Sequence, residues 1–456
     1  MSELNPARAL AVRVMSTVRE REAFTAEILD PRLRDAHLKH EDAAFCRMLC
    51  LGVTATRGTL DEFIDRCMNT PDDIRCDVRD ALRISAYEML FLEKADHAAV
   101  DQGVELVRFV QPKAVRLANA VLRKMAKAKE EFPFGDPATD DAAMARLFGF
   151  PLWIAQLLVS SLGRTQAMEF MRVSNTQAPV YFGVNALRSS DQNVQKAFEE
   201  AGHALKPVVL PGTAIPIEGC FKADSPQAVA EPIAKKLFAA GAILVSDAAA
   251  QCVASSAIPV RKPSSFLEVG SGRGTKTLLL QSNARRRYGS QMKLSALDSH
   301  GFKGDLLLDR TKRYNVDVAE TICADARDLH DSLGSRTFGA AFIDAPCSGL
   351  GTLRRHPELR WRLQESDIEA MAQLGLEMLI GTGAHVSVGG RLTYATCTVT
   401  ARENEYVVKA FLESRMGSNF KIVPTPAGPA SKLFCKTTLT DGGCDAHFAA
   451  SLQRVR

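Results

Sequence analysis

The sequence predicts a multidomain protein in which an all-α bundle is followed by a small α+β domain and then by a doubly wound α/β domain. Three observations predict it. Apolar residues recur at helical spacing up to about residue 128, helix and strand patterns mix up to about residue 260, and strands alternate with helices from Ser264 onward. The length of 456 residues also allows about three domains at ~150 residues each.

The first 130 residues are expected to form the helical domain. Apolar side chains recur there three and four residues apart, in the groups Leu10, Val14 and Val18; Phe45, Leu49 and Val53; Leu60, Ile64 and Met68; and Leu82, Ala86 and Leu90. No strand-like alternation interrupts this spacing. The polar stretch 130–141, which contains proline and glycine, predicts a linker at its end.

A second domain is expected over residues 142–260. Its pattern predicts a helix at 151–162, a strand in the apolar run PVYFGVNAL, and further helices near 193–201 and 225–238. Interspersed helices and strands of this length are typical of a small α+β domain.

The α/β domain is expected over residues 261–456. Five apolar segments in it are predicted to be strands: SSFLEV, MKLSALD, ETICAD, GAAFIDA and GRLTYAT. Because helical stretches separate these segments, we expect a parallel, Rossmann-like sheet with helices on both faces. Ligands bind at the carboxyl ends of the strands in such a sheet.

The composition is that of an ordinary globular protein, with 46% hydrophobic and 24% charged residues. No apolar run approaches ~18 residues, and the start MSELNPARAL lacks the pattern of a secretory signal. The eleven cysteines are odd in number and include no CxxC pair, so neither a disulfide framework nor a metal site is expected. We therefore expect a cytoplasmic protein with free thiols and without a membrane or metal partner.

Basic residues cluster locally, although the net charge is only +4. Seven basic and no acidic residues stand between positions 108 and 129, and four arginines stand in RRHPELRWR at 354–362 (Arg354, Arg355, Arg360 and Arg362). Clustered guanidinium groups match phosphate geometry and bind a polyanion. Solvated helix faces are the alternative. Nucleic-acid contacts are predicted for Arg123, Lys124, Arg354, Arg355 and His356.

A glycine-rich turn follows the first predicted strand of the α/β domain, in LEVGSGRGTKT. Gly270, Gly272 and Gly274 allow a tight turn and a close backbone approach to a ligand. The helix predicted from Thr275 onward presents free backbone N–H groups at its start. A Walker A loop is excluded, because the Gly-Lys-Ser/Thr sequence at the required spacing is missing.

Acidic residues end the second and third predicted strands of this domain. Asp298 and Asp325 stand where an acid can hydrogen-bond the ribose and the adenine of an adenosine-containing cofactor. Each could instead be a helix N-cap or a turn residue. On these residues alone the cofactor could be NAD or S-adenosylmethionine.

Two cysteines follow the fourth and fifth predicted strands, Cys347 in DAPCSGLG and Cys397 in YATCTVT. Thiols at neighbouring strand ends would face one pocket, an arrangement that does not suit hydride transfer but suits methylation of a pyrimidine. A thiolate that adds to carbon 6 of cytosine makes carbon 5 nucleophilic. Asp344 would contact the base. Either cysteine alone could instead be a small buried hydrophobe.

These motifs resemble those of the Nol/Nop/Sun cytosine-5 RNA methyltransferases, and the whole chain is similar to the bacterial ribosomal-RNA members of that family. The specific motifs are DAPCSGLGTLRRHPELRW and YATCTVTARENE, and ILVSDAAAQ is similar to the segment before the family's catalytic core. The helical region, with NAVLRKMAK at 119–127, resembles a NusB-like RNA-binding domain.

The resemblance implies roles for the matching residues. Cys397 would be the nucleophile, Cys347 would assist product release, and Asp344 would contact the base. S-adenosylmethionine would be the donor and 16S ribosomal RNA the partner. Lys303 stands where the family often has an arginine. The implied cofactor-binding residues are Glu268, Gly270, Gly272, Gly274, Lys276, Asp298, Lys303, Asp325 and Asp344.

The chain departs from the family pattern in two places. The first cofactor loop, usually Cys-Ala-Ala-Pro-Gly-Gly-Lys, is Gly-Ser-Gly-Arg-Gly-Thr-Lys at 270–276, and DGGCDAHFAASL differs from the usual Asp-Gly-Phe-Phe ending. Two other functions stay open. One is methylation of transfer RNA, and the other is a non-catalytic RNA-binding assembly factor on a degenerate methyltransferase fold.

Overall fold

The computed structural model describes residues 3–209, 216–425, 433–440 and 443–456. The chain forms two compact units. The helical unit comprises Met1–Thr176 and Leu353–Leu363, and the sheet unit comprises Gln177–Thr352 and Gln364–Arg456. The helical unit extends past the boundary predicted at residue 130, and the division into three domains stays a prediction.

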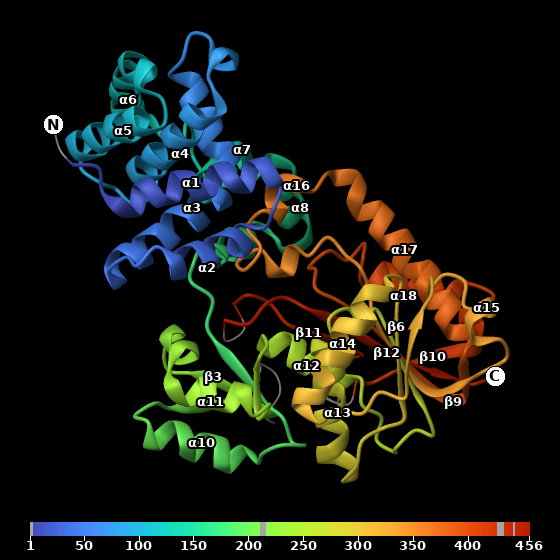
Figure 1. Cartoon of the computed structure of the whole chain (residues 1–456). Helices are drawn as coiled ribbons and strands as arrows, with labels where there is room; N and C mark the ends of the chain where they lie inside the picture. The colour runs from blue at the N-terminus through green and yellow to red at the C-terminus, as the bar shows by residue number, and fades with distance from the viewer. Residues whose placement is uncertain (1–2, 210–215, 426–432, 441–442) are drawn as a thin grey trace. The chain divides into compact units, whose positions relative to one another are not determined.

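The described part of the helical unit contains helices and no strands, which confirms the all-α prediction (Figure 1). Its α-helices are α1 (Pro6–Arg21), α2 (Thr25–Asp35), α3 (His40–Arg66), α4 (Cys76–Leu90), α5 (Asp96–Val110), α6 (Val115–Ala128), α7 (Asp141–Phe148), α8 (Leu152–Leu162), α9 (Arg164–Ser174) and α16 (Leu359–Arg362). Short 3-10 turns lie at η1 (Pro71–Asp73), η2 (Pro112–Ala114) and η3 (Lys129–Glu131).

The helical spacing in the sequence becomes the core of this unit. Val14, Leu49, Val53 and Leu60 are buried in one cluster that α1, α3 and α4 share. Residues three and four apart lie on one helix face, so each helix turns its apolar stripe inward. No single described helix is long and apolar enough to span a membrane. The consecutive helices α7 and α8 reach the required length and apolar content only together, and the chain bends by 107° between them.

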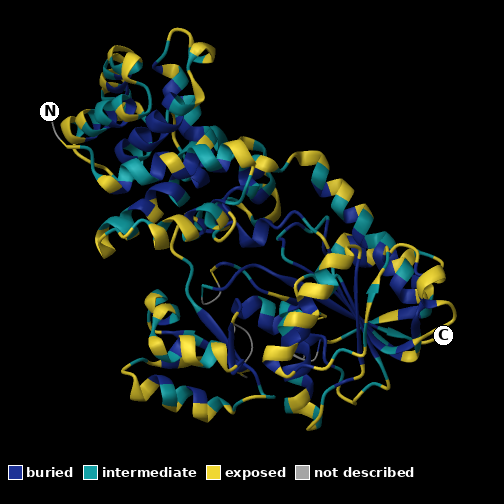
Figure 2. Ribbon diagram, viewed as in Figure 1, coloured by how far each residue is buried: buried dark blue, intermediate teal, exposed yellow. Residues whose placement is uncertain are grey.

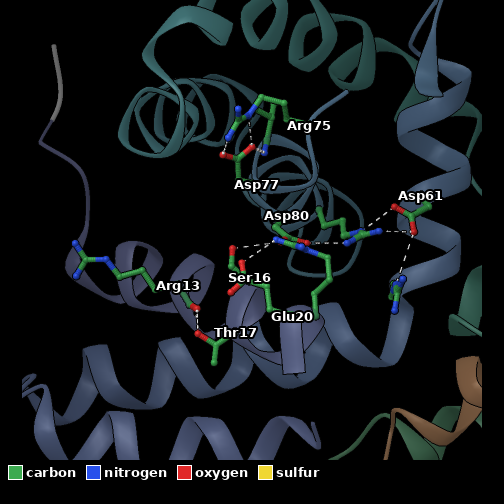
Figure 3. A network of polar contacts seen from close by, with 12 residues as sticks. Arg13, Ser16, Thr17, Glu20, Asp61, Arg75, Asp77 and Asp80 are labelled. Atoms are coloured by element: carbon green, nitrogen blue, oxygen red, sulfur yellow. Dashed lines mark hydrogen bonds and ion pairs between the residues drawn. The ribbon is translucent and has the colours of Figure 1, made fainter. Parts of the chain in front are cut away.

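A network of buried charges joins α1, α3 and α4 (Figure 3). Asp80 is 1% exposed and accepts hydrogen bonds from Arg83 at 2.7 Å and from Ser16 at 3.3 Å. Burial acts to lower the pKa of Arg83, but Asp61 and Asp80 outweigh it and raise that pKa. A buried charge without its partner is strongly destabilising, so this network fixes how the three helices pack.

The segment Leu353–Leu363 packs inside the helical unit, although the chain on both sides of it belongs to the sheet unit. Arg360 is fully buried and donates hydrogen bonds to Asn175 Oδ1 at 2.8 Å and to the Ser174 carbonyl at 3.2 Å. Its guanidinium carbon lies 3.9 Å from the centre of the Phe150 ring. Burial lowers the pKa of Arg360 to about 9.

The prediction that Arg360 belongs to a phosphate-binding cluster is therefore wrong, whereas for the exposed Arg362 it stays a prediction. Their guanidinium groups bind protein carbonyls, since Arg362 donates to the Ala23 carbonyl at 2.7 Å. Charged residues in a motif do not reveal whether their partner is water, phosphate or a distant backbone group. The neighbouring Trp361 anchors the same segment by donating to the Ala55 carbonyl at 3.0 Å.

The sheet unit begins with a small antiparallel sheet in the order β2-β3-β1-β4, which agrees with the α+β prediction. Its strands are β1 (Tyr181–Val184), β2 (Leu205–Val209), β3 (Pro216–Ala223) and β4 (Ile243–Val245). The accompanying helices are α10 (Asp191–Glu200), η4 (Pro226–Ala230), α11 (Pro232–Ala239) and α12 (Ala248–Ser256).

The large sheet has the order β10-β12-β9-β8-β5-β6-β7, with β11 paired to β12. Five strands are parallel and correspond to the five predicted ones, which confirms the doubly wound fold: β5 (Phe266–Val269), β6 (Leu294–Asp298), β7 (Glu320–Cys323), β8 (Phe338–Asp344) and β9 (Val386–Thr396). The remaining elements are α13 (Thr275–Tyr288), α14 (Gly301–Tyr314), α15 (His330–Leu333), α17 (Glu365–Ala384), α18 (Glu405–Glu413), η5 (Leu350–Thr352) and η6 (Gly417–Asn419).

Three antiparallel strands extend the sheet beyond β9 and were not predicted: β10 (Phe420–Val423), β11 (Phe434–Lys436) and β12 (Phe448–Arg454). No helix lies between β10, β11 and β12 in the described residues, so the strand–helix alternation that predicts the other strands gives no signal here.

Helices cover both faces of the large sheet, and its strands are mostly buried (Figure 2). Successive strand residues point to opposite faces. Phe266 and Phe342 pack with residues of α12, α13 and α14, whereas Leu267 and Ile343 pack with residues of α17 and α18. Because apolar side chains are buried on both faces of the sheet, the register of the strands is fixed. The position of each strand end is fixed with it.

The Arg360 side chain gives a stability prediction. We expect Arg360→Ala to lower the free energy of unfolding of the helical unit by about 3 kcal/mol, because it leaves a cavity and removes the donors of buried carbonyls. Both tryptophans of the chain, Trp153 and Trp361, lie in this unit, so their fluorescence during urea titration reports on it. The exposed Arg362→Ala variant should change the value by only about 0.5 kcal/mol. Equal effects of the two variants would contradict the anchoring role.

Candidate functional site

The glycine-rich turn between β5 and α13 forms a backbone cradle. Gly270, Gly272 and Gly274 have φ angles of 79°, 54° and 82°, in the left-handed region that favours glycine. A Cβ atom on Gly270 would lie 2.5 Å from the Asp344 carbonyl oxygen, whereas a Cβ on Gly272 would meet nothing closer than 4.0 Å. The turn thus packs tightly behind Gly270 and leaves space beside Gly272. Among the described residues, no side chain caps the α13 N-terminus, so its backbone N–H groups can bind a ligand.

Asp298 lies at the end of β6 next to this turn. Its carboxylate accepts hydrogen bonds from the Gly272 and His300 backbone N–H groups, both at 3.0 Å, and Lys303 Nζ lies 3.1 Å away. Burial acts to raise the pKa of Asp298, but these three partners outweigh it and lower that pKa. The carboxylate therefore stays ionised and ties the glycine turn to β6.

Asp325 follows the carboxyl end of β7, the strand next to β6, and is exposed. Arg327 binds its carboxylate through the guanidinium at 2.6 Å and lowers the pKa of Asp325. A contact between Asp325 and the adenine of the cofactor would therefore either replace the ion pair with Arg327 or form in addition to it.

Glu268 lies in β5 below the turn and is fully buried. Burial raises the pKa of Glu268 to about 8, and the nearby Asp344 charge acts in the same direction. Within the described residues, neither carboxylate oxygen makes a hydrogen bond of ordinary geometry. A buried polar group of this kind is costly unless a ligand or solvent binds it, so the site has unused capacity for a polar ligand group.

Lys276 and Asp344 form an ion pair between the start of α13 and the end of β8. Lys276 Nζ lies 2.6 Å from Asp344 Oδ2. Burial acts to lower the pKa of Lys276, but the Asp344 charge outweighs it and raises that pKa. Gly274 and Lys276 are the residues that the altered loop shares with the family pattern, and the Lys276 cation lies beside the Asp344 carboxylate.

The two cysteines meet at the ends of β8 and β9. Cys347 Sγ and Cys397 Sγ are 3.2 Å apart, and the Cys397 backbone N–H donates to Cys347 Sγ at 3.2 Å. The hydrogen bond between the thiols lowers the pKa of Cys397 and raises the pKa of Cys347 well above its ordinary value. Lys276 contributes to the lower Cys397 pKa. Cys397 is therefore the stronger candidate for the thiolate, and both side chains are partly accessible.

Two buried acids beside the cysteines were missed from the sequence. Glu403 is 1% exposed and accepts hydrogen bonds from both cysteine loops. Asp445 is fully buried, its backbone N–H donates to Asp247 Oδ1 at 2.9 Å, and its charge acts to raise the pKa of Cys397. Both acids lie in motifs noted in the sequence, ARENE and DGGCDAH. Their place in these motifs is the sequence feature that could have identified them as site residues. Residues 441 and 442 of the second motif lie outside the described residues.

The five predicted nucleic-acid contacts all lie in the helical unit, whereas the catalytic and cofactor candidates all lie in the sheet unit. Arg123 and Lys124 are exposed on α6, and their side chains bind Asn119 at 3.2 Å and Asn69 at 3.5 Å. The other three lie together in the segment that Arg360 anchors: Arg354, Arg355 and His356. The His356 ring packs edge-on against Phe24, with 5.8 Å between the ring centres.

Two protein families match separate parts of the chain. Residues 258–453 match the family of 16S rRNA methyltransferases RsmB/F, and residues 5–127 match the NusB family. The chain is 28% identical to ribosomal RNA small subunit methyltransferase B of Klebsiella pneumoniae (strain 342) over 93% of this chain and 94% of that protein. The same protein of Escherichia coli O6:K15:H31 (strain 536 / UPEC) is also 28% identical, with the same coverage.

Solved structures with low sequence identity share the fold. The crystal structure of PH0851 superimposes with a TM-score of 0.77, at 22% identity and with both chains covered completely. NSun6 from Pyrococcus horikoshii, crystallised with SFG, has a TM-score of 0.56 at 17% identity, covering 68% of this chain and all of that one.

The raised pKa of Glu268 predicts a pH dependence of stability. The folded carboxyl stays protonated up to about pH 8, whereas the unfolded one ionises above about pH 4.5, so unfolding releases a proton in this range. Wild-type stability should therefore fall as the pH rises from 5 to 8, by up to about 1.4 kcal/mol for each pH unit.

Glu268→Gln should remove most of this fall, as measured by thermal unfolding followed by circular dichroism at pH 5.5, 6.5 and 7.5. Glu320→Gln is the matched control. The Arg336 hydrogen bond lowers the pKa of Glu320, so its contribution is lost only in acid. A Glu268→Gln variant with the wild-type pH dependence would contradict the assignment.

Proposed function

We propose that this protein methylates carbon 5 of a cytosine in 16S ribosomal RNA, because residues 258–453 match the family of 16S rRNA methyltransferases RsmB/F and residues 5–127 match the NusB family. The observation that carries the proposal is the pair of thiols, 3.2 Å apart, at the ends of neighbouring parallel strands. A pyrimidine held there would have a thiolate beneath carbon 6.

The methyl donor is S-adenosylmethionine, whose sulfonium group supplies an electrophilic methyl. The open space beside Gly272, the start of α13, which no described side chain caps, and the buried carboxyl of Glu268 fit a ligand with several polar groups. In this proposal the residues that hold the cofactor are Glu268, Gly270, Gly272, Gly274, Lys276, Asp298, Lys303, Asp325 and Asp344.

The side chains of this site divide the work of the reaction. Cys397 Sγ bonds to carbon 6 of the cytosine and pushes an electron pair toward the ring, which makes carbon 5 nucleophilic. Asp344 contacts the polar edge of the base, and the Lys276 cation beside it stabilises the charge that develops on the ring. After carbon 5 is methylated, its proton leaves to solvent, and the electron pair of the broken carbon–hydrogen bond restores the double bond between carbons 5 and 6. The carbon–sulfur bond breaks as that double bond forms, and its electron pair returns to Cys397 Sγ. Cys347, whose Sγ lies 3.2 Å from Cys397 Sγ, assists this release.

RNA is the expected partner of the helical unit. Arg123 and Lys124 present cations to solvent on α6, and Arg354, Arg355 and His356 lie in one short segment of the same unit. Arginine and lysine bind the phosphate backbone with little sequence preference. The specific cytosine is then selected by the shape of the RNA and by the sheet unit.

A methylation assay followed by bisulfite sequencing tests this function. The purified protein is incubated with S-adenosylmethionine and protein-free 16S ribosomal RNA, and one newly protected cytosine is expected. Protection only in transfer RNA would move the substrate to that RNA. If the protein does not bind S-adenosylmethionine in a titration, the altered glycine turn has disabled the site and the assembly-factor hypothesis replaces the enzyme.

The roles of the two cysteines predict opposite phenotypes. Cys397→Ala should abolish methylation and leave the dissociation constant of S-adenosylmethionine within about threefold of wild type, because the nucleophile does not hold the cofactor. Cys347→Ala should instead trap a covalent protein–RNA adduct, visible as a retarded band on a denaturing gel. A Cys397→Ala variant that still methylates RNA would refute the assignment.

The charges on α6 predict a salt-dependent defect. Arg123→Ala combined with Lys124→Ala should weaken RNA binding and reduce the slope of log affinity against log salt by about 1 to 2, while kcat at saturating RNA is retained. Filter binding at several salt concentrations measures the slope. Lys409→Ala, an exposed lysine of the sheet unit, is the control and should leave the slope unchanged. An unchanged slope in the double variant would remove α6 from the RNA-binding surface.

A further inference from the structure

One buried carboxylate holds the two cysteine loops together. Glu403 accepts hydrogen bonds from the Ser348 backbone N–H at 2.6 Å and from the Ser348 hydroxyl at 2.8 Å. It also accepts from the hydroxyls of Thr400 at 2.6 Å and Thr398 at 3.2 Å. A carboxylate has about four acceptor positions, so the cysteine loops fill its capacity.

The residues that Glu403 binds stand next to the cysteines in the chain. Ser348 follows Cys347, and Thr398 follows Cys397. The Ser348 and Thr398 hydroxyl oxygens are also 2.8 Å apart, so one hydroxyl can donate to the other instead of to the carboxylate. The two loops leave different strands, so this hydrogen-bonded cluster directly joins the residues that follow the two thiols.

Glu403 itself is held rigidly. Its side chain and its three hydrogen-bonding neighbours are all 2% exposed or less. The Tyr394 hydroxyl donates to the Glu403 carbonyl at 2.8 Å, which ties its backbone to β9. Water cannot replace a lost partner easily in such a place, so each of these hydrogen bonds is strong and costly to remove.

The charge of Glu403 also distinguishes the two cysteines. It acts to raise the pKa of Cys347, whereas the Lys276 cation acts to lower the pKa of Cys397. Glu403 thus favours the protonated thiol at Cys347, whereas the charges around Cys397 oppose one another, because Asp344 and Asp445 act to raise its pKa. The hydrogen bond between the two thiols is what lowers the Cys397 pKa.

We propose that Glu403 is a positioning residue for the cytosine-5 reaction. It holds the Cys347 and Cys397 loops so that Cys347 can assist the release of the RNA adduct that Cys397 forms. This inference rests on the proposed function. Glu403 touches neither base nor cofactor in this role. It acts on the reaction only through the two loops.

Glu403→Gln tests the proposal, because it keeps the shape of the side chain and removes its charge and half of its acceptor capacity. We expect kcat for RNA methylation to fall by about 100-fold, with the KM for RNA and the cofactor dissociation constant within about threefold of wild type. Glu405→Gln, two residues away in the same motif and partly exposed, should keep kcat within about twofold. Glu403→Asp, which keeps the charge, should recover part of the lost kcat.

A second measurement needs no RNA. Iodoacetamide labelling at pH 7.5, followed by mass spectrometry of the two cysteine peptides, should favour Cys397 in the wild type, and Glu403→Gln should narrow this preference by about tenfold. If wild-type protein methylates no RNA but shows this Glu403-dependent preference, the proposed function fails, whereas the control of the two cysteine loops by Glu403 stands. An unchanged preference, or an unchanged kcat in an active enzyme, would overturn the inference.

Two milder variants keep the test valid if Glu403→Gln does not fold. Ser348→Ala and Thr398→Val each remove one donor and leave the carboxylate in place, and each should lower kcat by about tenfold. Their combination should cost less than the product of the single effects, because both act through one carboxylate. Full additivity would show that the two loops are not joined through Glu403.

Discussion

The parallel pairing of β8 with β9 is the interaction on which the candidate site depends. Asp344 lies opposite Ala395, and the Ala345 N–H donates to the Ala395 carbonyl at 2.9 Å. The pairing continues past the strand ends, since the Gly351 N–H donates to the Cys397 carbonyl at 2.9 Å. A shift of one residue would turn every side chain of a strand to the other face. The apolar layers on both faces of the sheet therefore enforce the short distance between the thiols.

The glycine-rich turn and the candidate catalytic groups are in direct contact. Gly270 packs so closely against the Asp344 carbonyl that no side chain fits there, and Lys276 reaches back from the same turn to the Asp344 carboxylate. A change in the turn is thus transmitted directly to the residue that would contact the base. This coupling explains how the loop can differ from the family pattern over several positions and still keep its lysine.

The sequence predicts the parts of this protein that follow local rules. The helical spacing before residue 128, the five parallel strands and the residues at their ends could all be derived, because period and strand–helix alternation are local properties. Arg360 could not, since a buried and an exposed arginine look alike in a motif when the partner carbonyls lie about two hundred residues away. Glu403 and the strands β10 to β12 were missed because no periodic pattern marks them, and because Glu403 also binds Ser348 of the other cysteine loop, 55 residues away.

The interleaving of the two units has a consequence for how the protein is made. The ribosome finishes the chain up to Thr176 early, but the helical unit still lacks Arg360 and Trp361, which are synthesised only after the whole of the stretch 177–352. The helical unit therefore lacks the side chains of Arg360 and Trp361 while the residues of β1 to β8 are synthesised. The helical unit can therefore close only after the residues of β1 to β8 have been synthesised and Leu353–Leu363 has left the ribosome. The helical unit is thus complete only when a segment encoded within the sheet unit has been synthesised, although most of its residues come first in the chain.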